Sequence, residues 1–393
     1  MKLLIVSPKF HPVIGGGETY VLNSAKQMHA QGAEVHIAAE PHADRNIADY
    51  PFVVHEIEGL SDSKLDVING TANLHRLVEE LKPDMIHVHG YFGLIIVGFV
   101  NIKNIPVVAS VHSTPVWGTR IVGGMDSFET ELSFARRVTA MARPGLLTAA
   151  NEVYADAAIK IADGNVPVAV LPYPVDADYF ISGNRAVYRD QFGLKDTDKL
   201  ILVPSRIIER KGIREAVLAM NDLPEDFYLC LPGAVEPLDA NFWKSVTEEP
   251  VYSRVKGRIL IPKDKVIYDG MPDLYSAADI IAMPSYYEGA PVATVEAMAS
   301  CKPFVGADSQ GINGFIRHEK NGLLVPKKNP KELAQAILKS SKSPEQNEKY
   351  TTQARADIEE LTWDKQIAVL LNAYKQVADA TAESVEDKRT QLA

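Results

Sequence analysis

The chain contains very few cysteines, since Cys230 and Cys301 are the only two among 393 residues. Two cysteines cannot form a disulfide framework or a metal cluster, which excludes the small disulfide-stapled folds of secreted proteins. Long apolar runs are also missing, because no stretch approaches the roughly 18 to 20 residues that span a bilayer. The first residues run directly into a predicted strand rather than into a signal-peptide pattern. We therefore expect a cytoplasmic protein without a strong membrane signal.

Positive charge is scarce as well. The chain carries 41 Lys and Arg against 51 Asp and Glu, a formal net charge of −10. Residues 1–175 hold 13 basic and 18 acidic residues, so this part alone has a charge of 13 − 18 = −5. Such a balance argues against nucleic acid as a partner and against a basic face that docks on anionic membranes.

The length and the pattern of the chain indicate two α/β domains. A chain of 393 residues is too long for one ordinary core, and 46% hydrophobic with 23% charged residues is typical of a soluble enzyme. Short apolar runs that suit buried parallel strands alternate with helical patterns. We predict an N-terminal domain over 1–175, a C-terminal domain over 176–360 and a final helix over 361–393 whose polar tail is frayed from about Ala380.

One strand–loop–helix stretch organises the second domain. An apolar run over 278–283 is followed by a small-residue loop and by helical spacing from Val292. Glu288 lies in the predicted loop and Glu296 in the predicted helix, both near a helix N-terminus at the carboxyl end of a parallel strand. Nucleotides bind in that position of open α/β sheets. The alternative is that the two carboxylates only favour the helix dipole.

Two further strand-to-helix turns carry candidate phosphate ligands. Gly15, Gly16 and Gly17 occupy the first turn, where the missing Cβ atoms let a ligand approach backbone amides. Arg206 and Lys211 fall in the corresponding turn of the second domain, where two fixed cations can neutralise a diphosphate. A plain flexible turn and a solvated basic turn are the respective alternatives.

Three histidines lie at predicted strand ends of the first domain. His87 and His89 alternate along the strand over 85–88 and point to one face, and His112 ends the apolar strand over 106–111. A metal site at His87 and His89 lacks an evident third ligand. For His112, a satisfied core histidine is the alternative to a role in the site. Asp176-Ala177-Asp178 looks like a metal-binding DxD motif, but it lies in the predicted linker and we interpret it as a turn.

Taken together, these motifs resemble those of a known family. Glu288, seven residues and Glu296, followed by AlaMetAla and LysProPheVal, are similar to the signature of retaining glycosyltransferases of the GT-B type, family 4 in particular. The GlyGly-x-Glu pattern that ends at Glu18 and the spacing of Arg206 and Lys211 are similar to two other motifs of that family. The resemblance covers nearly the whole chain. It implies an α/β GT-B fold, in which two Rossmann-like domains face an interdomain cleft, the first for the acceptor and the second for the nucleotide-sugar donor.

The family resemblance also implies an activity and its residues. The activity is transfer of a sugar from a nucleotide diphosphate sugar to an acceptor hydroxyl with retention of configuration and without a metal or other cofactor. Glu296 would hold the ribose, His112 and Glu288 the sugar, and the basic pair the diphosphate. The expected catalytic residues are Glu288, His112, Arg206 and Lys211. The expected donor-binding residues are Gly16, Gly17, Arg206, Lys211, Glu288, Gly289, Ala290, Pro291, Val292 and Glu296.

Within the family we favour UDP linked to glucose or N-acetylglucosamine as the donor and a small-molecule or glycan acceptor. The alternatives are a GDP-mannose-dependent mannosyltransferase, a GT-B phosphorylase or sugar-nucleotide epimerase, and a nucleotide-sugar binding protein without turnover. A dehydrogenase is disfavoured because GlyxGlyxxGly is absent after the first strand.

The sequence departs from the family pattern in the loop after Glu288, at Cys301, where a Gly is commoner, and at the expected hinge before Val175. Pro291 removes one backbone donor that a phosphate cradle could have used. Tyr173 and Pro174 precede Val175 and Asp176, where the family usually has AsnGly.

Overall fold

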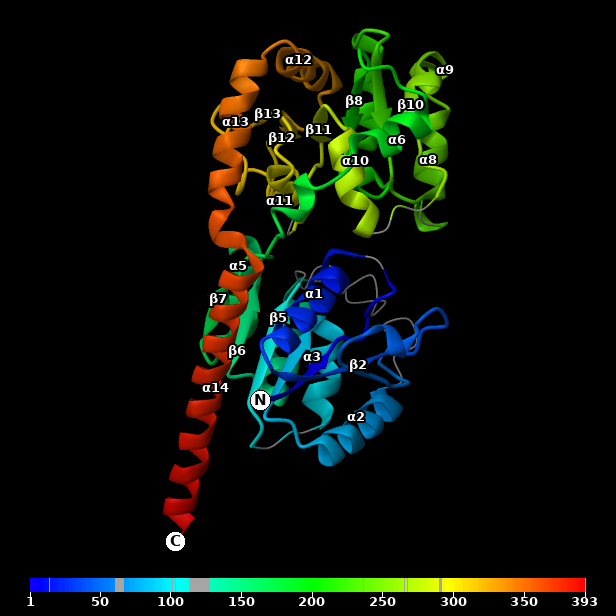
Figure 1. Ribbon diagram of the computed structural model, residues 1–393. Helices are drawn as coiled ribbons and strands as arrows, with labels where there is room; N and C mark the ends of the chain where they lie inside the picture. The colour runs from blue at the N-terminus through cyan, green and yellow to red at the C-terminus, as the bar shows by residue number, and fades with distance from the viewer. Residues whose placement is uncertain are drawn as a thin grey trace. The chain divides into compact units, whose positions relative to one another are not determined.

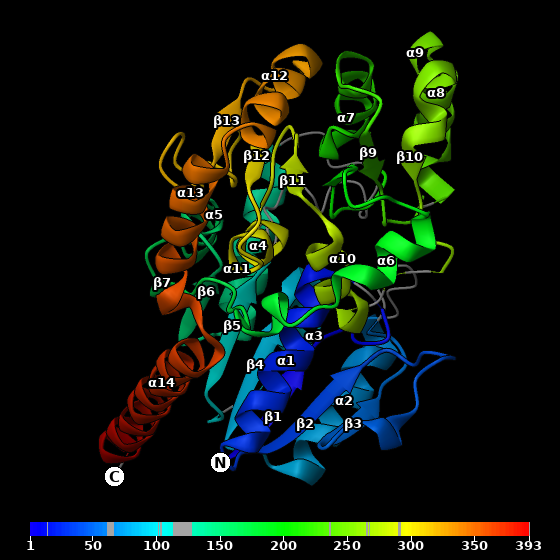
Figure 2. The ribbon, with the colours of Figure 1, turned by 45° about the horizontal axis from the view of Figure 1, so that its top comes forward.

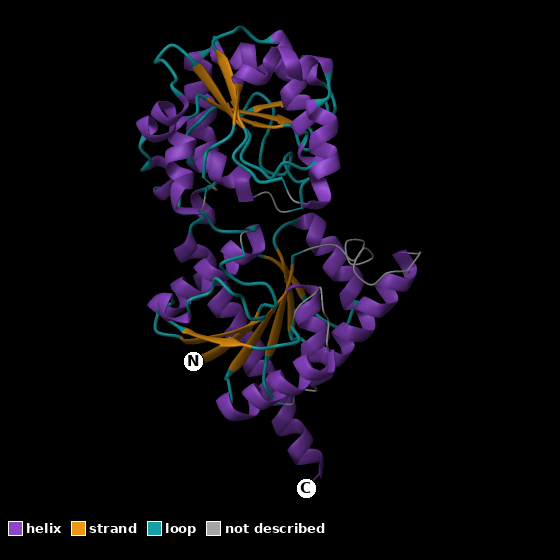
Figure 3. Ribbon diagram, turned by 90° about the vertical axis from the view of Figure 1, so that its right-hand side faces the viewer, coloured by secondary structure: helices purple, strands orange, loops and turns teal. Residues whose placement is uncertain are grey.

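A computed structural model describes residues 1–13, 15–60, 67–100, 102, 104–112, 128–235, 237–264, 266, 268–289 and 292–392. The chain divides into two compact units (Figure 1). Unit 1 comprises residues 1–174 and 363–393, and unit 2 comprises residues 175–362. In each unit a central sheet has helices on both faces (Figure 3). None of the helices in these described ranges is both long and apolar enough to span a membrane.

Unit 1 contains a parallel sheet of seven strands in the order β3-β2-β1-β4-β5-β6-β7. Its strands are β1 (Lys2–Val6), β2 (Glu34–Ala39), β3 (Val53–Glu56), β4 (Met85–His89), β5 (Val107–Val111), β6 (Leu146–Ala149) and β7 (Val168–Val170). Its helices are α1 (Gly16–Ala30), α2 (Val67–Leu81), α3 (Gly90–Val100), α4 (Phe128–Ala142), α5 (Glu152–Ala162) and α14 (Trp363–Leu392).

Alternating side chains of the strands form two cores in unit 1. Leu4 and Val6 of β1 pack with helices α2, α3, α4 and α5 on one face of the sheet. Leu3 and Ile5 point to the other face, where they pack with α1 and α14. Figure 2 shows α1 lying across this second face. Because both faces are covered, the strands read as continuous apolar runs in the sequence.

Unit 2 contains a parallel sheet of six strands in the order β10-β9-β8-β11-β12-β13. Its strands are β8 (Lys199–Leu202), β9 (Phe227–Cys230), β10 (Ile259–Leu260), β11 (Ile280–Met283), β12 (Phe304–Ala307) and β13 (Leu323–Val325). Its helices are α6 (Arg185–Phe192), α7 (Ile213–Ala219), α8 (Ala240–Thr247), α9 (Pro250–Val255), α10 (Met271–Ala277), α11 (Val292–Ala299), α12 (Pro330–Ser341) and α13 (Pro344–Asp357).

Several local predictions can be compared with these elements. Helix α12 begins at a side-chain cap, because Asn329 Oδ1 accepts from the Glu332 backbone N–H at 3.1 Å. Asp176 Oδ1 accepts from the Tyr179 backbone N–H at 3.0 Å, so its carboxylate caps a turn as we interpreted it. The polar tail that we predicted from about Ala380 is part of α14, which continues to Leu392.

Candidate functional site

The strand order of unit 2 places the two predicted motif loops side by side. The loop with Arg206 and Lys211 follows β8, and the loop with Glu288 follows β11. These strands are neighbours and parallel, so their carboxyl ends meet at one edge of the sheet. The chain reverses its direction of winding between them, and ligands of open α/β sheets bind at such a switch point.

Glu288 lies at the centre of a charged cluster at this edge. Lys211 Nζ donates to Glu288 Oε1 at 2.6 Å, and Arg210 Nη1 donates to Oε2 at 3.4 Å. The carboxylate is buried, with 4% of the residue exposed. Burial lowers the pKa of Lys211, and the charge of Glu288 opposes that shift. We predicted that Lys211 binds a phosphate and that Glu288 binds a sugar. In the structure, the two side chains form an ion pair with each other.

The backbone around Glu288 is fixed by a glycine in the left-handed region. Gly311 has φ +92°, and a Cβ at this position would lie 2.3 Å from the Glu288 carbonyl oxygen. The Glu288 backbone N–H donates to the neighbouring Gln310 carbonyl at 2.9 Å. Both the main chain and the side chain of Glu288 are therefore held in place.

Arg206 differs from Lys211 in its surroundings. Arg206 is exposed, and its positive charge lies close enough to Lys211 to lower the pKa of that residue. The main chain at Arg206 packs tightly, because a Cβ on Gly233 would lie 2.5 Å from the Arg206 Cα. The turn thus presents an exposed guanidinium on a rigid backbone, which suits bidentate binding of an anion.

Glu296 occupies α11 and has an apolar environment. The residue is 9% exposed, and the Tyr275 hydroxyl donates to its Oε2 at 3.0 Å. Burial raises the pKa of Glu296 to about 7, and the bond from Tyr275 counteracts part of this rise. The predicted position of Glu288 in the loop and Glu296 in the helix is confirmed.

The remaining residues predicted for this loop divide into two groups. Gly289 is the last described residue of the loop, and Val292 is the first residue of α11. Ala290 and Pro291 lie outside the described residues.

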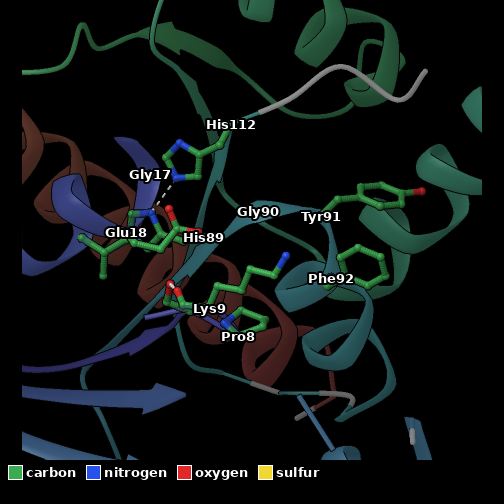
Figure 4. A pocket seen from close by; sticks show the side chains of 11 residues that line it. Pro8, Lys9, Gly17, Glu18, His89, Gly90, Tyr91, Phe92 and His112 are labelled. Carbon is green, nitrogen blue, oxygen red and sulfur yellow. Dashed lines mark hydrogen bonds between the residues drawn. The ribbon is translucent and has the colours of Figure 1, made fainter. Parts of the chain in front are cut away.

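In unit 1, the predicted glycine turn lines a cavity of about 150 Å³. Gly16 and Gly17 are the first two residues of α1, and Gly15 is its N-cap. The cavity is bordered by the end of β1, the first turns of α1 and α3 and the ends of β4 and β5 (Figure 4). Its lining residues are Ser7, Pro8, Lys9, Gly17, Glu18, Val21, His89, Gly90, Tyr91, Phe92 and His112.

His112 lies at this cavity in a chain of hydrogen bonds. Its Nε2 is 2.8 Å from His89 Nδ1, and its Nδ1 is 2.5 Å from the Tyr173 hydroxyl. Burial lowers the pKa of His112 to about 4 and that of His89 well below the usual range, so both rings are neutral at pH 7. His112 is thus hydrogen-bonded and also borders the cavity.

His87 lies deeper, under helix α14. Its Nδ1 is 2.5 Å from the Tyr374 hydroxyl of α14, and its Nε2 is 2.7 Å from Ser110 Oγ. Burial, helped by the nearby His112, lowers the pKa of His87 to about 3. Both ring nitrogens are engaged in protein contacts, which gives His87 a structural role in fastening α14 to the sheet.

Three residues of these clusters were missed by the sequence reading: Arg210, Tyr275, and Tyr173 as a partner of His112. His89 was expected at a strand end on one face with His87, but its bond to His112 was not foreseen. Among the three missed residues, only Tyr173 carried a signal, because it stands where the family usually has another residue.

Comparisons with known proteins agree with this architecture. The profile of "Glycosyl transferases group 1" matches residues 184–357, and that of "Glycosyltransferase Family 4" matches residues 14–179. A D-inositol 3-phosphate glycosyltransferase of Xylanimonas cellulosilytica is 24% identical over 387 residues, 92% of this chain and 92% of the relative.

Two solved structures share the fold. Sucrose-phosphate synthase of Thermosynechococcus elongatus has a TM-score of 0.80 at 18% identity and covers 96% of this chain and 99% of its own. Anabaena Alr3699/HepE in complex with UDP and glucose has a TM-score of 0.79 at 18% identity, over 96% of this chain and 100% of its own.

Proposed function

Because the chain belongs to the glycosyl transferases group 1 and has the GT-B fold, we propose that it moves glucose or N-acetylglucosamine from a UDP-linked donor to an acceptor hydroxyl with retention of configuration. Use of a nucleotide sugar follows from the family. The choice of UDP is supported by Anabaena Alr3699/HepE, a neighbour in fold that was solved with UDP and glucose.

The observation that carries the proposal is the charge arrangement at the β8/β11 edge. An exposed Arg206 stands beside Lys211, whose ammonium is held by a buried carboxylate. Negative charge grows on the diphosphate as the glycosidic bond breaks, and fixed cations stabilise that charge without having to reorganise. We assign both cations to the diphosphate, with the amides near Gly16 and Gly17 as further donors.

The carboxylates receive different roles. Glu296 sits next to Tyr275 in an apolar environment and is assigned to the ribose hydroxyls, which do not react. Glu288 and His112 are assigned to the transferred sugar. The Lys211–Glu288 ion pair also affects donor binding. When a diphosphate binds Lys211, the bond between Lys211 and Glu288 becomes weaker. Hydroxyl groups of the sugar can then take the place of Lys211 as hydrogen-bond donors to Glu288.

We propose that no metal ion takes part. Arg206 and Lys211 supply the two positive charges that a divalent cation otherwise brings to a diphosphate leaving group. The Asp176-Ala177-Asp178 motif is occupied by its own turn and by Arg355, which donates to Asp178 Oδ1 at 2.5 Å.

For the acceptor, the relatives favour a phosphorylated polyol. Several of them are named D-inositol 3-phosphate glycosyltransferases, and one of these spans 92% of this chain. We therefore include D-inositol 3-phosphate among the acceptors to be tested.

A donor screen tests the proposal. UDP-glucose, UDP-N-acetylglucosamine and GDP-mannose are offered with and without D-inositol 3-phosphate, simple sugars and inorganic phosphate, and release of the nucleoside diphosphate is measured. We expect UDP release that depends on an acceptor. If GDP-mannose were the only donor from which a nucleoside diphosphate is released, the protein would be a mannosyltransferase. Dependence on inorganic phosphate would establish a phosphorylase, and a product formed without acceptor an epimerase. Tight binding of UDP without any release would establish a binding protein.

A further inference from the structure

Glu288 is held by two cations, one on each carboxylate oxygen. Lys211 Nζ lies 2.6 Å from Oε1, and Arg210 Nη1 lies 3.4 Å from Oε2. The two cations are neighbours in the short 3₁₀ helix η4 (Glu209–Lys211), in which successive side chains point about 120° apart, so they approach the carboxylate from different directions. The motif that the sequence shares with its family contains Arg206 and Lys211 and leaves Arg210 without a role.

The main chain of both loops is fixed around this cluster. The Tyr286 backbone N–H donates to the Arg210 carbonyl at 2.8 Å. Gly212 has φ +67°, and a Cβ at this position would lie 2.1 Å from the Pro284 carbonyl oxygen, so the two loops touch at a glycine. A change of partner at Glu288 is therefore a change among side chains, made without moving the loops.

The two bonds to Glu288 differ in how much room they leave. The Lys211 side chain is 13% exposed and its bond is short, whereas the Arg210 side chain is 30% exposed. Arg210 Nη1 is shared between Glu288 Oε2 and the Tyr287 carbonyl, both at 3.4 Å. The usual N–H···O distance is about 2.9 to 3.0 Å, so Arg210 can come closer to the carboxylate. Its Cζ also lies 5.6 Å from the centroid of the Tyr287 ring, a contact that keeps the guanidinium beside the loop.

A diphosphate that binds Lys211 removes the closest partner of Glu288. The residue is 4% exposed, and loss of one partner from a buried pair is strongly destabilising because a charge is left without compensation. Arg210 already contacts the other oxygen and can compensate that charge. Oε1 then becomes available to a sugar hydroxyl, while the bond at Oε2 keeps the carboxylate in its orientation.

We propose that Arg210 is a positioning residue that holds Glu288 at Oε2 when the donor diphosphate takes Lys211 from Oε1, so that Oε1 can accept a hydrogen bond from a hydroxyl of the transferred sugar. The binding of a diphosphate at Lys211 rests on the proposed function. The ability of Arg210 to compensate the charge of Glu288 does not, because it follows from contacts within the protein.

Arg206 offers a matched comparison for a cation that binds the diphosphate itself. It is exposed, and its charge acts on Lys211. In the part of the chain that the structure describes, Glu288 forms its ion pairs with Arg210 and Lys211 and not with Arg206. Arg206→Met therefore removes a charge of the same size from the same cluster without removing a partner of Glu288.

The first test measures this compensation without any ligand. Arg210→Met and Glu288→Gln are combined in a double-mutant cycle, once in the wild type and once in Lys211→Met, which has no ammonium to hold Glu288. Urea denaturation gives the equilibrium constant for unfolding of every combination. We expect the coupling between Arg210 and Glu288 to be about threefold or more larger in the Lys211→Met background, expressed as a factor in that constant. An equal or smaller coupling in that background overturns the proposal.

The second test measures UDP affinity by calorimetry in the wild type, Arg210→Met, Glu288→Gln and the double variant. In the wild-type background we expect Arg210→Met to raise the Kd for UDP about tenfold, because Glu288 is left unpaired in the complex. In the Glu288→Gln background no carboxylate needs a partner, so the same substitution should change the Kd less than about twofold at a physiological ionic strength of about 0.15 M. Arg206→Met should weaken binding in both backgrounds.

The pattern of losses separates the possible roles of Arg210. An equal loss of UDP affinity in both backgrounds, as expected for Arg206→Met, shows that Arg210 binds the diphosphate directly and overturns the proposal. Unchanged affinity in both backgrounds shows that Arg210 plays no part and overturns it as well. If the wild type binds neither UDP nor GDP, the proposed function is wrong, and the urea measurement still decides whether Arg210 compensates Glu288.

Arg210→Lys distinguishes charge from packing. Lysine keeps the positive charge and loses the planar guanidinium that lies over the Tyr287 ring. We expect this variant to recover most of the UDP affinity that Arg210→Met loses. A loss as large as in Arg210→Met shows that the contact with Tyr287 is responsible and contradicts the proposed role.

Discussion

Lys211 and Glu288, 77 residues apart in the chain, form a buried ion pair of 2.6 Å at the edge where β8 and β11 end. The pair joins the two loops that carry the family motifs. It holds the Lys211 and Glu288 side chains in fixed positions before any donor is present.

The first prediction concerns the stability of unit 2. Removing one partner of a buried pair leaves an unpaired charge, which costs about 3 to 5 kcal/mol. We expect Lys211→Met and Glu288→Gln each to lower the free energy of unfolding. The double variant should lose less free energy of unfolding than the two single variants lose together, because it leaves neither charge unpaired. Urea denaturation of the four proteins measures the coupling, and strictly additive losses would show that the pair contributes nothing.

The second prediction is that transfer needs no metal. With Arg206 and Lys211 on the diphosphate, activity should persist in an excess of a chelator such as EDTA, measured as nucleotide release. Arg206→Lys serves as a comparison, because it keeps the charge but loses the bidentate fork and should be slower than the wild type. Activity that disappears with chelator and returns with Mg²⁺ or Mn²⁺ would contradict the assignment.

The third prediction is a pH dependence of donor binding that comes from Glu296. Its pKa in the folded protein is raised to about 7. On the proposed assignment, the ionised carboxylate accepts from two ribose hydroxyls, which the protonated form cannot do. UDP affinity should therefore rise about tenfold between pH 6 and 8 from this residue alone. The shift also acts on folding. The protonated form is favoured in the folded state, so this contribution to stability is complete below pH 4.5 and is lost as the pH rises through 7.

Glu296→Gln is the control for this pH dependence. UDP itself titrates near neutral pH, and this contribution is the same for both proteins. We therefore compare the UDP affinities of the wild type and the variant, measured by calorimetry at several pH values. A pH profile that is identical in the two proteins would show that Glu296 does not titrate in this range.

The fourth prediction concerns acid stability of unit 1. The pKa of His87 is lowered to about 3 and that of His112 to about 4, so the folded state disfavours their protonation. Their contribution is present above pH 6.5 and is lost as the pH falls toward the folded values. Each histidine should cost about 1.4 kcal/mol per pH unit below 6.5. His87→Gln should flatten this dependence.

Much of the fold could be predicted because the signals are local. The strands are buried on both faces and show as apolar runs, and the start of α12 carries its cap at Asn329. Helix α3 was missed because its sequence is apolar on nearly every side, so no helical period stands out.

The partners within the site could not be read from the sequence, because they depend on strand order. Tyr374 and His87 are 287 residues apart, and nothing near either residue indicates the other. The same holds for Tyr275, which meets Glu296 only because α10 and α11 pack in one core. Motif spacing indicated which residues belong to the site, but not which of them form hydrogen bonds or ion pairs with one another.

The most direct test of the account compares Glu288→Gln with Glu296→Gln, both first shown to be folded by circular dichroism. UDP is titrated by calorimetry, and single-turnover transfer is measured at saturating donor. We predict that Glu296→Gln weakens UDP binding by roughly 1 to 3 kcal/mol, the value of a bond to a charged group, and changes turnover of bound donor less. Glu288→Gln should bind UDP as the wild type does, because Lys211 stays available to the diphosphate, and should lose most of its turnover. Normal turnover in Glu288→Gln together with loss in Glu296→Gln would reverse the two roles. Wild-type behaviour of both variants would contradict a catalytic site at these carboxylates.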